Sequence, residues 1–325
     1  MLLTKKDILL STKRYLFVAL LSLVLIPSQT YAAGHYFSLE AGAREFRHDD
    51  VKATLATANS PEGEADGTIS GHGIDIIIGG MPLQLIPALT GSNLVLEVQL
   101  HYATADESHS QTSPTGLLGF VPIDGSAIST GAAASTLDFE TNYDQYGIDA
   151  LVRSEVSSTA TNKVTAIWGL TYSRFEESHK FSGRTAAGAK ITDPMLKDDT
   201  ATDYFGLVFG LGAEHKLGNG WIASTNGRVD LLVANAELDA DQTLLIFNTL
   251  SVSDNKTELA ARVRGKVGLA KDFGSFQIGA NATVDFLSFA PTVDHPLFDA
   301  TPYESHLEDD SLLSYGVNLQ LSIPF

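Results

Sequence analysis

The stretch FGLVFGLGAE, residues 205–214, alternates large apolar residues with small ones. Phe205, Leu207, Phe209 and Leu211 fall on one face of an extended chain, and mostly glycine falls on the other. Because successive side chains of a β-strand point to opposite faces, this period of two predicts a strand with one apolar face.

The same period recurs along the chain, which predicts an all-β protein of ten antiparallel strands. We place these strands near 35–47, 70–79, 93–103, 143–155, 163–176, 203–215, 221–234, 258–270, 275–288 and 311–325. Two further strands, within 117–123 and 137–141 or within 243–252, would give twelve.

The predicted connections alternate in length. The short ones are 80–92, 156–162, 216–220 and 271–274, and the long ones are 48–69, 104–142, 177–202, 235–257 and 289–310. Short turns at one end and long loops at the other are typical of a transmembrane β-barrel with periplasmic turns and extracellular loops.

The N-terminal segment is predicted to be a cleaved signal peptide, residues 1–32, followed by the barrel, 33–325. Lys5 and Lys6 begin a basic region, and the apolar run 15–26 that follows is too short to span a bilayer. Small residues before Ala33 suit a signal peptidase. An uncleaved membrane anchor is the alternative.

Composition excludes several classes of function. The chain has no cysteine, so disulfides and thiolate metal sites are excluded. With 21 basic residues against 39 acidic ones, its net charge is -18, which argues against nucleic acid as a partner.

Aromatic residues at the strand ends are predicted to form two girdles at the membrane interfaces. Those at the periplasmic ends are Phe37, Trp221, Phe276 and Phe325, and those at the outer ends are Tyr102, Tyr146, Tyr172, Phe205 and Phe286.

The last predicted strand resembles the C-terminal β-signal of bacterial outer-membrane barrels. Its alternate residues Leu319, Leu321 and Ile323 are apolar, and an aromatic residue, Phe325, ends the chain. This resemblance implies an outer-membrane location, with lipid and lipopolysaccharide as neighbours and recognition by the barrel-assembly machinery through Phe325. The hairpin formed by 203–207 and 216–221 is similar to those of porin-like and major outer-membrane-protein families.

The inward-facing positions carry charges of both signs. Those predicted to line the lumen are Glu40, Arg44, Asp75, Glu97, His101, Asp149, Arg153, Arg228, Asp230, Arg262, Arg264, Lys266 and Asp285. They are consistent with a paired ionic core or with a narrow porin-like conduit for ions or small solutes. Inward glycines, among them Gly73 and Gly147, are expected to leave space for a small pore.

We place the conduit first among the functions. The alternative from another class is a non-conducting surface scaffold or adhesin that presents acidic loops, with 104–142 either displayed or folded into the lumen. The oligomeric state stays open.

A minor alternative is a protease similar to the omptins, which carry Asp and Asp–His pairs at the barrel rim. The nearest candidates are 48–50, which reads His-Asp-Asp, and the pair Asp294-His295. Their loops adjoin when the barrel closes, so they would not face each other across a groove. We therefore predict no enzymatic activity, no catalytic or metal-binding residues and no cofactor.

Overall fold

The computed structural model describes most of the predicted barrel. The described residues are 35–48, 51–53, 63–65, 68–82, 94–112, 123–124, 136–185, 187–244, 248–296 and 304–325. The predicted signal peptide lies outside these residues and stays a prediction.

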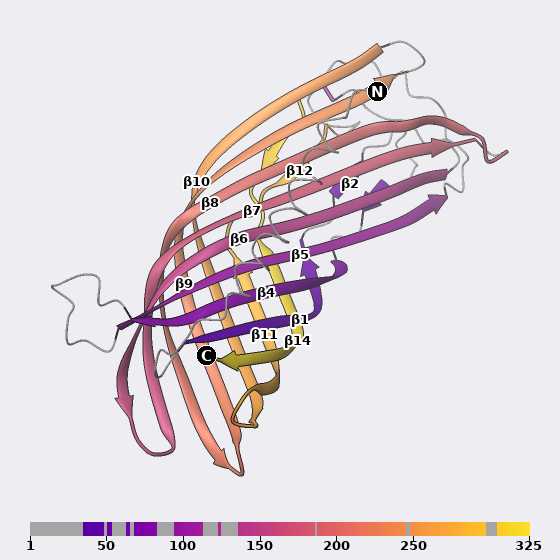
Figure 1. Ribbon diagram of the computed structural model, residues 1–325. Helices are drawn as coiled ribbons and strands as arrows, with labels where there is room; N and C mark the ends of the chain where they lie inside the picture. Colours follow the sequence, from indigo (N-terminus) through magenta and orange to yellow (C-terminus); the bar gives the residue numbers. More distant parts are fainter. Residues whose placement is uncertain are drawn as a thin grey trace, which may run out of the picture. The chain divides into compact units, whose positions relative to one another are not determined.

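Ten antiparallel strands close into one barrel. They are β1 (Tyr36–Arg47), β4 (Thr68–Pro82), β5 (Leu94–Thr112), β6 (Thr136–Ser158), β7 (Asn162–Arg184), β8 (Lys190–Gly218), β9 (Trp221–Leu244), β10 (Asn248–Asp272), β11 (Gln277–Leu287) and β14 (Leu312–Pro324). Each pairs with the next along the chain, and β1 pairs with β14, so the sheet has no open edge (Figure 1). The prediction of ten strands is confirmed.

Strands β5 to β10 extend well beyond the predicted strands, so the predicted loops 177–202 and 235–257 are wrong in large part, and the predicted loop 104–142 is wrong at its two ends, 104–112 and 136–142. The stretches 137–141 and 243–252, considered as extra strands, instead lengthen β6, β9 and β10. In β9, Ala236, Leu238 and Ala240 are buried, whereas the residues between them are exposed. The polar outward residues suggested loops, but the inward residues continue the alternation.

Four short strands lie outside the barrel. β2 (Val51–Ala53) pairs with β3 (Gly63–Ala65), and β12 (Thr292–Asp294) pairs with β13 (His306–Glu308). We call the described parts of the connection between β11 and β14, residues 288–296 and 304–311, the capping segment.

The turn between β8 and β9 shows how the sequence determines the short connections. Its two residues, Asn219 and Gly220, both have positive φ angles, 51° and 76°. Asn-Gly is the pair that favours a two-residue type I′ hairpin, because Asn and Gly tolerate this backbone region best.

The described residues contain no helix that is long and apolar enough to cross a membrane.

The hydrophobic core lies in the half of the barrel away from these turns, which we call the outer half. Strand residues such as Phe139, Tyr143 and Phe181 pack there with Phe289 and Leu307 of the capping segment. The connection 289–310, predicted to be an outer loop, therefore contributes buried residues to the core.

Candidate functional site

A network of charged side chains occupies the barrel interior below this apolar core. Asp149 of β6 and Asp230 of β9 are both fully buried. Arg228 donates to both, at 2.7 Å to Asp149 Oδ2 and 3.0 Å to Asp230 Oδ1. Arg264 of β10 adds a bond of 2.6 Å to Asp230, and Thr171 donates to the other oxygen of Asp149. Each buried carboxylate therefore has at least one cationic partner, as its desolvation requires.

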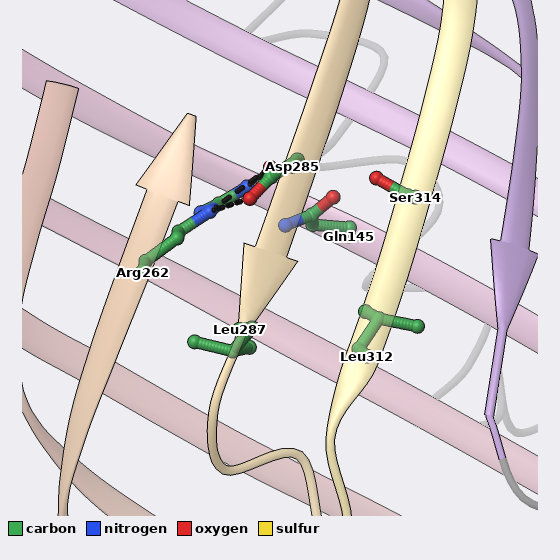
Figure 2. A pocket seen from close by; sticks show the side chains of 6 residues that line it. All are labelled: Gln145, Arg262, Asp285, Leu287, Leu312 and Ser314. Atoms are coloured by element: carbon green, nitrogen blue, oxygen red, sulfur yellow. Dashed lines mark hydrogen bonds and ion pairs between the residues drawn. The ribbon is translucent and has the colours of Figure 1, made fainter. Parts of the chain in front are cut away.

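A second pair lies where the charged network meets the apolar core. Arg262 Nε donates to Asp285 Oδ1 at 2.8 Å, and the guanidinium spans both carboxylate oxygens. Figure 2 shows this pair beside Gln145, with Leu287 near it in a small recess. The lining of the recess changes there from charged to apolar side chains. The six residues that line it are Gln145, Arg262, Asp285, Leu287, Leu312 and Ser314.

The remaining interior charges nearer the short turns are paired in the same way. The closest pairs are Arg44–Asp75 at 3.0 Å, Arg153–Glu97 at 2.8 Å and Lys266–Glu40. Arg44–Asp75 and Arg153–Glu97 join neighbouring strands, whereas Lys266 of β10 reaches Glu40 of β1 although β11 and β14 lie between these strands in the sheet.

Two inward glycines, Gly73 and Gly147, do not leave open space. A Cβ atom at Gly147 would lie 2.4 Å from Nε2 of His101, and one at Gly73 would lie 2.6 Å from Nε of Arg44. At these two positions the space is filled by a side chain of a neighbouring strand, Arg44 or His101. The expectation that these glycines widen a pore is therefore wrong at both positions.

All thirteen residues predicted to line the lumen thus lie on the interior face, and twelve belong to the ion pairs above. The exception is His101, whose Nε2 has no hydrogen-bond partner. A role in lining a pore stays a prediction.

A separate buried cluster lies in the outer half, and the sequence analysis considered only one of its residues, His295. Nδ1 of His179 (β7) lies 2.7 Å from Asp198 Oδ1 (β8), and its Nε2 lies 2.8 Å from Glu177. The other oxygen of Asp198 lies 3.0 Å from Nε2 of His295 in the capping segment. The Glu177 contact is an ion pair without an aligned hydrogen bond. None of these four side chains is more than 2 % exposed.

The two carboxylates keep the central imidazole charged. Burial by itself lowers the pKa of His179, but Asp198 and Glu177 outweigh burial and raise it to about 10. Burial likewise raises the pKa of Asp198, and His179 with His295 reverses this effect and holds that pKa well below its usual value. The cluster therefore contains an imidazolium between two carboxylates at neutral pH.

Ser305 extends this cluster into a chain of the residue types found in hydrolytic triads. Its Oγ lies 2.8 Å from Nδ1 of His295. The two ring nitrogens are exchanged relative to the usual triad, in which Nε2 faces the serine. Ser305 is also only 1 % exposed, and Asp198 is shared with His179. A nucleophile must reach its substrate, so this arrangement supports a structural role.

The omptin-like candidates that lie among the described residues do not form an open pair of acid and histidine. His48 stacks on Tyr143 and Phe175 and lies 3.1 Å from Asp310. Asp49 and Asp50 are outside the described residues. Asp294 lies 3.9 Å from His306, while the neighbouring His295 is buried. Within the part of the chain that the structure describes, no group of three His, Asp or Glu residues is placed to hold a metal ion.

The outer surface of the barrel wall is apolar. Leu207, Leu231, Val267 and Leu319 are each about half exposed or more, at 49 %, 55 %, 58 % and 71 %. An exposed apolar belt around a closed barrel with a charged interior is stable in lipid and unfavourable in water.

Aromatic residues lie at the margins of this belt. Those exposed on the wall are Tyr102, Tyr172, Phe205, Trp221 and Phe286, and those partly exposed are Phe37, Tyr146 and Phe276; Phe325 is exposed and follows the end of β14. Tyr102 pairs in register with Tyr146, and Tyr172 with Phe205. Their contact with the membrane interfaces stays a prediction, as does recognition of Phe325 during assembly.

Comparisons with known proteins find similarity in structure only. No protein-family model and no curated protein sequence matches the chain. The outer-membrane protease OmpT from Escherichia coli is 7% identical, with a TM-score of 0.49 over 92% of this chain and 99% of that one. The translocator domain of the autotransporter NalP from Neisseria meningitidis is 11% identical, with a TM-score of 0.41 over 97% and 96%. A major outer membrane protein from Thermus thermophilus is 13% identical, with a TM-score of 0.33 over 89% and 100%. We base no functional argument on similarities of this size.

A closed antiparallel barrel with a lipid-compatible exterior is the form in which β-sheets span bacterial outer membranes. The chain is a bacterial outer-membrane β-barrel. Its neighbours in that membrane are lipid and lipopolysaccharide, and its interior charges are shielded from lipid by the barrel wall. The long strands above the belt project beyond the membrane, because a strand needs only about ten residues to span it.

Proposed function

We propose that this outer-membrane barrel is a non-conducting scaffold that holds an extended polar sheet at the cell surface. The observation that carries the proposal is the filling of the interior at two levels, by paired charges in one half and by an apolar core in the other. The proposal includes no catalytic activity.

The ionic level argues against a conduit, which the sequence analysis placed first. A selective pore presents its charges to water and to passing ions. Here Arg228 and Arg264 donate to Asp149 and Asp230, whose side chains are fully buried. Charges that neutralise one another have little capacity to bind a passing ion.

The apolar level supports a seal. Phe289, Val293 and Leu307 of the capping segment are at most 4 % exposed, and all belong to the core inside the outer half. A dry apolar layer is a barrier to ions, because an unpaired ion would lose its hydration there.

The strand extensions supply the surface that such a scaffold would present. On the outward face of β9, Glu237, Asp239 and Asp241 are exposed. On β10, the facing residues are Asn255, Ser253 and Ser251. A paired sheet holds these side chains at fixed spacing, which a flexible loop does not. The sequence analysis placed the acidic residues of such a scaffold on loops. In this region we place them on strands.

Electrical recording from the refolded protein in planar bilayers tests this function. We expect no stepwise conductance and no swelling of liposomes in small sugars, in preparations whose barrels show heat-modifiable migration on gels. Reproducible conductance steps would overturn the scaffold and favour the conduit. Their loss on Arg228→Met substitution would then assign the conducting path to the charged network.

A further inference from the structure

The capping segment is attached to the barrel by side chains and by one backbone hydrogen bond, from Ser288 N–H to the carbonyl of Ala261 on β10, and shares no sheet with it. Its strands β12 and β13 have three residues each and pair with each other. The ten barrel strands form a closed ladder without them. Loss of the capping segment from its place would therefore leave the ladder of the barrel intact.

Polar contacts hold both halves of the capping segment. In the first half, Tyr204 donates to the backbone carbonyl of Phe289 at 2.9 Å. In the second half, the backbone N–H of Leu307 donates to Asp254 at 2.9 Å. Ser305 and His295 join the two halves at 2.8 Å.

Asp198 is the anionic centre of these contacts. It lies between an imidazolium of the wall, His179, and a histidine of the capping segment, His295. Because the site is fully buried, loss of the carboxylate charge would leave His179 with Glu177 as its one anionic partner and would replace the charged partner of His295 by a neutral, weaker one.

We propose that Asp198 and His295 form a latch that retains the capping segment as a releasable lid over the outer half of the barrel. Opening the latch exposes the apolar core to water and leaves the barrel wall and the ionic level in place. The lid goes beyond the proposed scaffold function, because it makes the apolar seal in the outer half of the barrel a movable element.

Cysteine labelling tests the latch cleanly, because the chain has no cysteine of its own. Val293 is 3 % exposed in the capping segment, so a Val293→Cys protein should react slowly with a membrane-impermeant maleimide. We expect Asp198→Asn or His295→Ala in that background to raise the labelling rate at least about tenfold.

A matched control lies in the same segment. His306 is exposed on β13, and His306→Ala should leave the labelling rate at the level of the Val293→Cys parent. Heat-modifiable migration on gels shows which variants retain the barrel. Should Asp198→Asn fail to fold, His295→Ala decides alone, because His295 lies outside the barrel strands.

Unchanged labelling in a folded His295→Ala protein would overturn the latch. Bilayer recording of the same variants separates the latch from the scaffold function. Faster labelling with silent bilayers supports both proposals, because the ionic level still seals the barrel. Faster labelling with conductance would support the latch and overturn the sealed scaffold.

Discussion

Asp149 and Arg228 meet at 2.7 Å although two strands, β7 and β8, separate their own strands in the sheet. The bond therefore crosses the interior instead of following the wall. Asp149 is fully buried and also accepts from Thr171 and Arg264, so it connects side chains of four strands.

Asp149→Asn should destabilise the barrel strongly. The change leaves Arg228 with one anionic partner where it had two, and breaking a buried pair in this way costs about 3–5 kcal/mol. We expect the midpoint of urea-induced unfolding in lipid or detergent to fall accordingly. Lys180→Ala, which removes a partly exposed lysine 3.9 Å from Glu140, is the control and should change the midpoint little. Equal midpoints for the two variants would contradict a stabilising role of the network.

A charge on the apolar belt should be costly only at membrane depth. Leu207→Arg on β8 places a guanidinium in the lipid-facing wall, which costs about 2–4 kcal/mol near the bilayer centre. Ala201→Arg, on the same face of β8 beyond Phe205, should fold into lipid vesicles almost as well as the parent. The measurement is the free energy of folding into vesicles, and similar losses for both variants would contradict the assigned belt.

The alternation of residue types was sufficient to predict the closed barrel and its ten strands, because each strand has one face in lipid and one in the interior. It was insufficient to place the strand ends of the extensions. There the outward residues are polar, as in loops, and only inward residues such as Ala236 and Leu238 carry the period.

The partners of the interior charges were beyond the reach of the sequence. Asp149 and Arg228 meet only because the wall curves. The pairing of His179 with Asp198 cannot be counted from the connection between β7 and β8, because the register of these strands shifts between Phe181 and Gly183. One signal was available for the buried cluster. Glu177 and His179 occupy alternate positions between Phe175 and Phe181, which marks them as inward residues.

Gly147→Leu should disturb the interior without adding charge. Its side chain would need the space now occupied by the imidazole of His101, so either His101 or the neighbouring strand must move. We expect a loss of about 1–3 kcal/mol in the free energy of folding. In a His101→Ala background the same change should cost less, and a double-mutant cycle measures this coupling. An additive result would show that the two sites do not share space.

The latch should open in alkali and hold in mild acid. The groups that face Asp198 and His179 are Glu177, His295 and Tyr143, with His48 and Asp310 close by. The folded pKa of His179 is about 10, above its usual 6.5, so its stabilisation is complete below about 6.5 and is lost as pH rises through about 10. The pKa values of Asp198 and Glu177 are lowered, so their contribution is present above their usual values near 4 and is lost only in stronger acid.

Labelling of Val293→Cys, normalised to an exposed cysteine such as Ser253→Cys on β10, should therefore stay constant from about pH 6.5 to 9 and rise near pH 10. His179→Gln removes the titrating group and should label faster at neutral pH with no such alkaline rise. Tyr143 does not account for the rise, because burial and the nearby Glu177 hold its pKa well above 10. An alkaline rise that persists in His179→Gln would assign the transition to another group and contradict the role of His179 in the latch.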